Sequence, residues 1–211
     1  MRRSPEISVL VATYNQGRFL KGCLESLLSQ SLHPSVYEVL VVDDGSTAST
    51  AQLLSGYRDR VHSIHLKAHR GLAAACNVGL ERARGRFLVR VDSDDRLDPR
   101  ALFQLLQATR GDGENVILLP DHWEVRGKVR RRVSPDVKDV FSWLAAGVLM
   151  PLEQVRRAGG YRPLFWEEVD LYLRLLERGV RPARLPKPLP RPPIRRSGSN
   201  TSPSRIQAVS V

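Results

Sequence analysis

The stretch Phe87-Leu88-Val89-Arg90-Val91-Asp92-Ser93-Asp94-Asp95 decides the fold that this sequence predicts. It begins as a short, partly β-branched apolar run after Gly85, which is typical of a β-strand. It ends in three carboxylates within four residues, which repel one another and are costly to bury unpaired. We therefore expect the strand to leave its sheet at Asp92, on the edge where open α/β sheets bind ligands.

Asp92 and Asp94 form an Asp-x-Asp pattern with two possible readings. The two side chains offer hard oxygen ligands to Mg²⁺ or Mn²⁺, which in turn bind phosphate oxygens. The alternative is an acidic turn that only caps the next helix. Asp98-Pro99 supplies that cap by itself, with Asp98 at the N-cap and Pro99 at the first helical position. The pattern therefore favours a metal site at Asp94 and Asp92.

The composition predicts one globular domain with anionic partners. The chain has 211 residues, of which 42% are hydrophobic, and a formal net charge of +11. Such a charge favours nucleotide phosphates, nucleic acid or an acidic membrane surface. Nucleic acid is the weakest of these, because the basic residues are spread along the chain without interleaved aromatic residues. We expect no nucleic-acid partner.

The two cysteines, Cys23 and Cys76, lie in separate helix-like segments. This placement favours reduced thiols of a cytosolic protein over a disulfide framework. No apolar run approaches the roughly 20 residues of a membrane span. We expect a cytoplasmic protein, with peripheral contact to the cytoplasmic face of a membrane as an option.

Strand-like and helix-like segments alternate four times in the first half of the chain. The expected strands are 7–13, 39–42, 61–66 and 87–91. Such alternation is typical of a mainly parallel sheet flanked by helices. Polar clusters at 13–15, 43–47 and 92–95 then follow the carboxyl ends of strands, so we expect them to meet on one rim.

The second half is less regular. It predicts a helix at 99–109, a strand at 116–119 and a hairpin at 123–133. A strand in the latter half of 141–150, a short helix from 151 and a strong helix at 167–179 follow. From 181 onward the chain is basic and rich in proline, and we expect its last ten or so residues to be disordered.

Five motifs in order give the chain a family resemblance over residues 7–179. They are Thr13-Tyr14-Asn15, Asp43–Thr47, Gly71–Gly79, Asp92–Asp95 and Glu167–Arg174. In this order they resemble the inverting glycosyltransferases of family 2. The resemblance implies a GT-A-type, Rossmann-like α/β fold with a smaller, irregular acceptor-side half. It divides the chain into one domain at 1–180, with halves at 1–98 and 99–180, and a tail at 181–211.

The resemblance also implies which residues hold a nucleotide-sugar donor. Thr13, Tyr14 and Asn15 match the segment that wraps the nucleoside, and Asp44 matches the carboxylate that accepts from the uracil ring nitrogen. Asp43 is as well explained by a capping role in the turn.

Three further donor contacts are implied. Asn77 would bond a ribose hydroxyl or an aspartate of the opening motif, unless it is an exposed polar position on its helix. Asp92 and Ser93 would contact the donor or metal-bound water, and Asp94 would ligate the cation.

The acceptor side of the resemblance rests on Trp166-Glu167-Glu168. Glu168 matches the catalytic base, which takes the proton of an acceptor hydroxyl during a single displacement. The alternative is an acidic first turn that only complements the helix dipole. Trp166 would form an apolar wall for a sugar, unless it is a buried core residue.

The chain departs from the family at three places. Cys76 replaces a frequent Arg, Ala48 replaces a frequent Asp, and a C-terminal His is missing. We expect Arg195 or Arg196 to neutralise the diphosphate in place of that His, because arginine suits phosphate oxygens. The alternatives are weaker metal binding or a C-terminal end that has lost this role.

The leading hypothesis is a metal-dependent inverting transferase that moves a hexose from a UDP-sugar to a saccharide or lipid-linked acceptor. The departures also fit a nucleotide-sugar-binding module of the same fold that has lost transfer.

Overall fold

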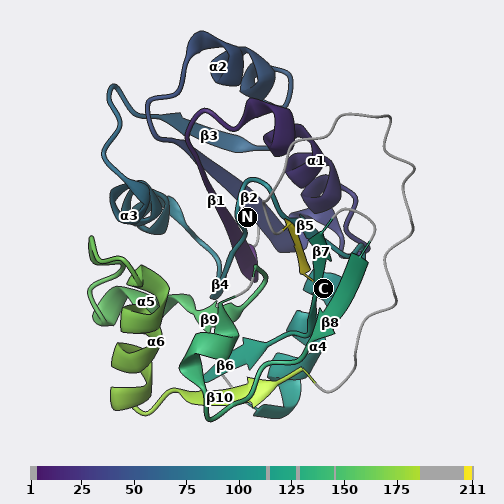
Figure 1. Ribbon diagram of the computed structural model, residues 1–211, viewed down its shortest axis with the longest axis vertical. Coiled ribbons are helices and arrows are strands. Elements are labelled where there is room, and N and C mark those ends of the chain that lie inside the picture. Colours follow the sequence, from purple (N-terminus) through teal and green to yellow (C-terminus); the bar gives the residue numbers. More distant parts are fainter. Residues whose placement is uncertain (1–3, 113–114, 127–128, 145, 186–206, 211) are drawn as a thin grey trace.

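The fold is built on a seven-stranded mixed sheet (Figure 1). The computed structural model describes residues 4–112, 115–126, 129–144, 146–185 and 207–210. Across the sheet the strands are β10 (Arg181–Arg184), β6 (Val116–Leu119), β9 (Leu149–Pro151), β4 (Phe87–Arg90), β1 (Ile7–Thr13), β2 (Tyr37–Asp43) and β3 (His62–His65). Only β9 runs antiparallel to its neighbours β4 and β6 among these pairs, so the expected mainly parallel α/β fold is confirmed.

Helices cover both faces of this sheet. The helices α1 (Gly17–Leu28), α2 (Ala48–Ser55) and α4 (Ala101–Asp112) contribute to one core layer, and α3 (Leu72–Arg82), α5 (Leu152–Arg157) and α6 (Glu167–Glu177) contribute to the other. Cys23 lies in the first layer and Cys76 in the second, both buried and unpaired. None of the helices in the described ranges is long and apolar enough to cross a bilayer.

The sequences of the central strands are almost continuously apolar because helices cover both faces of the sheet. Every residue of β2 and all but one of β1 are buried, as expected for parallel strands between two helical layers. Helix α3 approaches β1 so closely that a Cβ at Gly79 would collide with the side chain of Leu10. This close packing fixes the amino half of the sheet, whose strand ends carry the predicted site.

A second sheet of four strands stands beside the first. Its order is β5 (Arg96–Leu97), β11 (Gln207–Ser210), β7 (His122–Arg126) and β8 (Val129–Val133). Strands β7 and β8 pair as the expected hairpin. Strand β11 lies antiparallel to β7 and parallel to β5.

Two segments near the end of the chain pair with distant strands. The expectation of disorder over the last ten or so residues is wrong for 207–210, which form β11. Strand β10, just beyond the expected domain boundary at 180, pairs with β6 in the main sheet. Both pairings join segments far apart in sequence, which local composition does not reveal. Arg195 and Arg196 lie outside the described residues.

Candidate active site at the carboxyl rim of the sheet

The polar strand ends do meet on one rim. The register pairs Thr13 with Asp43, and the Asp44 N–H donates to the Thr13 carbonyl at 2.9 Å. Strand β4 runs parallel to β1 with Arg90 opposite Leu10, so Asp92 leaves the sheet next to the end of β1. Segments some 80 residues apart in the chain therefore line one edge, where open α/β sheets bind ligands.

The turn after β1 is locked to the turn after β2 by Asn15. Its backbone is left-handed, with φ of 54°. Its N–H donates to Ser46 Oγ at 2.8 Å, and its Oδ1 accepts from the Thr47 N–H at 3.0 Å. Asparagine tolerates this conformation better than most residues. Next to this lock, the buried Thr13 hydroxyl has no partner among the described residues, so a polar group remains available at the rim.

Asp43 caps the turn after β2, which is the role that the sequence offered for it. Its Oδ1 accepts from the Ser46 N–H at 3.0 Å, and its Oδ2 lies 2.8 Å from His65 Nδ1. Gly45 has φ of 76°, and a Cβ there would lie 2.6 Å from the Ala68 backbone. The turn thus needs glycine both for its conformation and for its close approach to the next loop.

Asp44 ties the loop after β3 to the rim. Its Oδ1 accepts from the Arg70 N–H at 2.8 Å and its Oδ2 from the Gly71 N–H at 2.9 Å. The same Oδ2 lies 2.8 Å from His69 Nδ1. The His69 ring stacks on Tyr14, with centroids 3.9 Å apart and planes inclined by 20°. The predicted base-binding carboxylate and tyrosine are therefore joined through His69, which the sequence reading had left unassigned.

Asn77 joins helix α3 to the chain before α6. Its Nδ2 donates to the Tyr161 carbonyl at 2.8 Å, and its Oδ1 accepts from the Tyr161 N–H at 2.8 Å. Both groups of the amide are used, so Asn77 clamps the chain before α6 to helix α3. Asn77 is partly buried, so it does not occupy the exposed polar position that was its alternative.

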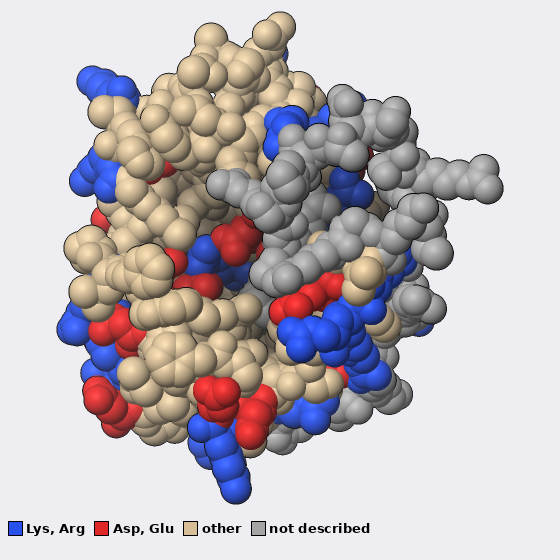
Figure 2. Space-filling model, viewed as in Figure 1, with Lys and Arg blue, Asp and Glu red and all other residues tan. Residues whose placement is uncertain are grey.

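Arg90 connects the acidic strand end to the predicted base. Its side chain is 6% exposed, and Nη2 bonds Asp92 Oδ1. Its Nη1 lies 2.5 Å from Glu168 Oε1 and 3.5 Å from Glu167 Oε1. One buried guanidinium thus holds three carboxylates, one from the turn after β4 and two from α6. Figure 2 shows acidic and basic side chains meeting in a hollow near the centre of this face.

The sequence reading missed Arg90 although it lies within the quoted stretch. The signal was a cation inside an otherwise apolar, buried strand. A buried charge is tolerated only with partners, so such a residue predicts carboxylates nearby.

Glu168 lies in an environment suited to a base. Burial raises its pKa to about 7, and the nearby charges of Asp92 and Glu167 act in the same direction. Arg90 opposes them and favours the carboxylate form. A carboxylate with a pKa near neutrality accepts a proton more readily than an ordinary surface glutamate. Tyr161, whose buried hydroxyl has no partner among the described residues, lies in the same neighbourhood.

The chemistry of Asp92 and Asp94 fits a divalent cation that the substrate helps to hold. Within the described ranges, no group of three or more His, Cys, Asp or Glu is arranged to hold a metal ion by itself. Mg²⁺ commonly binds one or two carboxylates together with substrate phosphates, so a two-aspartate set is sufficient. Asp98 lies just before α4, and its Oδ1 accepts from the Arg100 N–H at 2.9 Å.

Trp166 is not a buried core residue. Its side chain is 51% exposed and packs edge-to-face against Phe141 and Phe165. It directly precedes Glu167, whose carboxylate reaches Arg90. The alternative reading as a buried core residue is therefore wrong, and the role of Trp166 as an apolar wall for a sugar stays a prediction.

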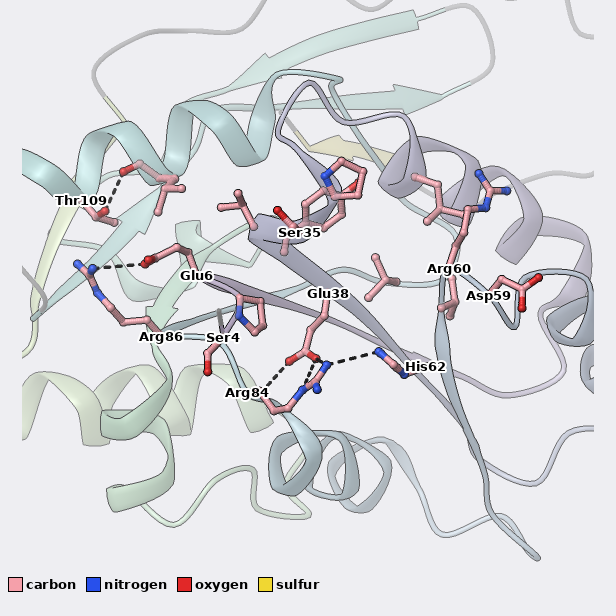
Figure 3. Close-up of a pocket in the computed structure, with 18 of the residues that line it drawn as sticks. Ser4, Glu6, Ser35, Glu38, Asp59, Arg60, His62, Arg84, Arg86 and Thr109 are labelled. Carbon is pink, nitrogen blue, oxygen red and sulfur yellow. Dashed lines mark hydrogen bonds and ion pairs between the residues drawn. The ribbon is translucent and has the colours of Figure 1, made fainter. Parts of the chain in front are cut away.

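A second hollow lies at the opposite, amino rim of the sheet (Figure 3). Its volume is about 1260 Å³. There Arg84 donates to the buried Glu38 from Nε at 2.9 Å and Nη2 at 2.7 Å, and Arg86 pairs with Glu6 at 3.4 Å. Cations at this rim also complement the carboxyl ends of helices, which carry partial negative charge. Arg84 and Arg86 thus have carboxylate partners at this rim. We place the candidate site at the other rim, where the polar strand ends meet.

Comparison with known proteins identifies the family of the chain. The model of the family described as "Glycosyl transferase family 2" matches residues 8–153. The putative glycosyltransferase EpsE of Bacillus subtilis (strain 168) is 33% identical over 204 residues, covering 86% of this chain and 70% of that protein. The putative glycosyltransferase EpsH of the same strain is 36% identical over 118 residues, covering 54% of this chain but only 33% of EpsH.

Solved structures share the fold. The chain is similar to S. aureus TarS 1–349 with a TM-score of 0.72 and 24% identity, covering 87% of this chain and 59% of that one. Its similarity to the mannosyltransferase PcManGT from Pyrobaculum calidifontis, solved with GDP-Man and Mn²⁺, has a TM-score of 0.69 at 18% identity, covering 88% and 55%. TarS 1–349 has also been solved with UDP and with UDP-GlcNAc.

Proposed function

Because the chain belongs to glycosyl transferase family 2, we propose that it transfers a sugar from a nucleoside-diphosphate donor to an acceptor hydroxyl. The observation that carries the proposal is the Arg90 bridge. It joins Asp92, at the predicted donor and metal end, to Glu168, at the predicted acceptor end. Donor and acceptor chemistry therefore meet within the reach of one guanidinium.

The donor we propose is a UDP-hexose. Thr13, Tyr14, Asn15 and Asp44 would hold the nucleoside, with the unpartnered Thr13 hydroxyl as a further polar contact. TarS binds UDP and UDP-GlcNAc in its crystal structures, which supports this choice of base. Asn77 remains a proposed contact to the ribose, because its amide keeps a second N–H and a second lone pair beside those used by Tyr161.

The reaction would be a single displacement with inversion. Glu168, as the carboxylate, accepts the proton of the acceptor hydroxyl while that oxygen bonds to the anomeric carbon. The bond from this carbon to the diphosphate oxygen breaks, and the nucleoside diphosphate leaves with the electron pair. Asp92 and Asp94 would hold a divalent cation, which offsets the charge that builds on the diphosphate.

A variant of Glu168 tests the base. Glu168→Gln keeps the size of the side chain and removes its basicity. We expect transfer to fall at least about a hundredfold, as is typical when a general base is lost, with donor affinity retained. Full activity in this variant would show that another group takes the proton.

Donor binding is tested without turnover. UDP together with Mn²⁺ should raise the melting temperature of the protein, because ligands that prefer the folded state stabilise it. No shift at millimolar UDP would refute the nucleotide site. The second candidate is a nucleotide-sugar-binding module without transfer activity, and the departures from the family at Cys76 and Ala48 support it. A rise in melting temperature with UDP, together with no transfer from any nucleotide sugar, would favour this candidate.

The acceptor we propose is a saccharide or a lipid-linked saccharide, consistent with a cytoplasmic protein that works beside a membrane. The choice between these acceptors depends on surfaces next to Glu168.

A further inference from the structure

The side chain of His69 makes the two contacts that the proposed function gives to the nucleobase. Its ring stacks on Tyr14, with centroids 3.9 Å apart and planes inclined by 20°. Its Nδ1 lies 2.8 Å from Asp44 Oδ2. A carboxylate only accepts hydrogen bonds, so this contact requires a hydrogen on Nδ1. An aromatic ring with an N–H group thus already uses the flat surface and the acceptor that we propose for uracil.

The carboxylate of Asp44 is not open to a ligand in this arrangement, because its side chain is only 3% exposed. Its Oδ1 accepts from the Arg70 N–H, and its Oδ2 accepts from the Gly71 N–H and from His69. The first two partners are backbone groups of the loop after β3. The imidazole is 50% exposed, and exposed side chains change rotamer rapidly. Of these three partners, only His69 can leave by a rotation of its own side chain.

Resting on the proposed function, we propose that His69 is a further residue of the donor site, which occupies the base position in the free protein and leaves it when the nucleobase enters. The base then takes over both contacts, to the ring of Tyr14 and to Asp44. The protein must first give up the contacts of His69. The apparent dissociation constant of every ligand that uses this position is therefore raised by one factor, the inverse of the fraction of protein in which the position is open.

A fixed wall for the base explains His69 less well. In that arrangement the base would lie against the imidazole while the imidazole stays in place. Asp44 would then remain 3% exposed, and the ring nitrogen of the base would find no route to it. The two explanations also differ in the sign of one measurement, because removal of a wall weakens binding and removal of a competitor strengthens it.

Calorimetric titration of the full chain with uridine, and with UDP and Mn²⁺, tests the proposal. His69→Ala removes the competing ring and leaves both backbone donors to Asp44. We expect about tenfold tighter binding of uridine and of UDP, by the same factor for both, as for a binding-competent state that is a tenth populated. His69→Phe keeps a ring on Tyr14 but has no N–H for Asp44, so its affinity should lie between those of the wild type and His69→Ala.

His65→Ala is the matched control variant. His65 Nδ1 lies 2.8 Å from Asp43 Oδ2, and the side chain is 53% exposed, so this variant removes an equivalent partner from the neighbouring aspartate. Asp43 serves the turn and not the base, so we expect wild-type affinity for uridine and UDP. Pyrophosphate with Mn²⁺ is the matched control ligand. It has no base, so it should bind the wild type and His69→Ala equally.

Weaker binding of uridine by His69→Ala would overturn the proposal, because His69 would then be a contact for the base. Unchanged affinity would also overturn it, as would an equal gain for pyrophosphate. The proposed function fails in a different way. If UDP with Mn²⁺ binds to neither the wild type nor His69→Ala, the nucleotide site itself is refuted, whereas equal binding of UDP to both refutes only the role of His69.

Discussion

The pKa of Glu168 sets the pH dependence of the proposed reaction. Burial raises that pKa to about 7, and only the deprotonated side chain can accept the proton of the acceptor. We therefore expect kcat/KM to rise with pH through about 7 and to level off above it, falling about tenfold per unit on the acidic side. A profile that stays level down to pH 5 would show that Glu168 is not the titrating base. Initial rates at saturating metal, measured between pH 5 and 9, provide the profile.

Arg90 should matter for stability as much as for chemistry. Arg90→Met leaves Asp92, Glu167 and Glu168 without their buried cation, and breaking a buried ion pair from one side costs roughly 3–5 kcal/mol of unfolding free energy. Arg90→Lys should lose less, because a cation remains. Urea unfolding measures both variants.

The control for Arg90 is a surface pair. Arg86 bonds Glu6 at 3.4 Å with both side chains more than 40% exposed, so Arg86→Met should cost less than about 1 kcal/mol. Equal losses at the two positions would mean that the Arg90 cluster is solvated.

The roles of some single residues could be predicted from the sequence, and the roles of others could not. The turn role of Asp43 follows from local spacing, and the structure shows it. Helix α4 begins at Ala101, so Asp98 and Pro99 lie just before it, and Asp98 bonds the Arg100 N–H without being the predicted N-cap. Asn77 binds the backbone of Tyr161, 84 positions away, and no local pattern carries that information. Arg90 could have been found, because a cation inside a buried strand requires a partner.

At the scale of elements, the junction of α5 and α6 depends on a glycine pair. Gly160 has φ of 67°, and a Cβ there would collide with Asn77 Oδ1. Gly159 has φ of 84°, but a Cβ there would meet none of the described atoms within 4 Å. Both alanine variants suffer the strain of a left-handed backbone, about 1–3 kcal/mol. Gly160→Ala should lose more, because it also displaces the Asn77 clamp.

The comparison is made by thermal or urea unfolding of the two alanine variants side by side. The fall in melting temperature caused by Gly160→Ala should be smaller in an Asn77→Ala background than in the wild type, because the side chain that clashes is then absent. Equal effects in both backgrounds would contradict the clamp.

The elements that alternate along the chain were predictable, and those that pair at long range were not. Strands β1, β2 and β4 follow from hydrophobic runs bounded by turn residues, and β3 from a short segment that alternates apolar and polar residues, each separated by a helical pattern. The antiparallel direction of β9 and the insertion of β11 between β5 and β7 depend on pairing across the chain. The strand propensity of a short segment does not say which other strand it will pair with.

At the scale of the molecule, β11 closes the smaller sheet and should contribute to its stability. It pairs with β7 over four residues and with β5 over two. Removal of residues 207–211 exposes both partners, and we expect a loss of roughly 2–4 kcal/mol, given about 1 kcal/mol for each net backbone hydrogen bond.

Urea unfolding of the shortened chain measures this loss, and removal of Val211 alone provides the control. Because β5 follows Asp95 directly, UDP should also stabilise the shortened chain less. An unchanged unfolding midpoint would mean that β11 does not hold the sheet together.

The two buried thiols offer a way to watch the molecule open. Burial raises the pKa of Cys76 to about 12 and that of Cys23 further, so neither reacts with an alkylating agent while its helix stays in place. One thiol reports on each side of the sheet. Equal labelling rates would mean that the protein opens as one unit, and a faster rate at one sulfur would identify the helical layer that detaches first.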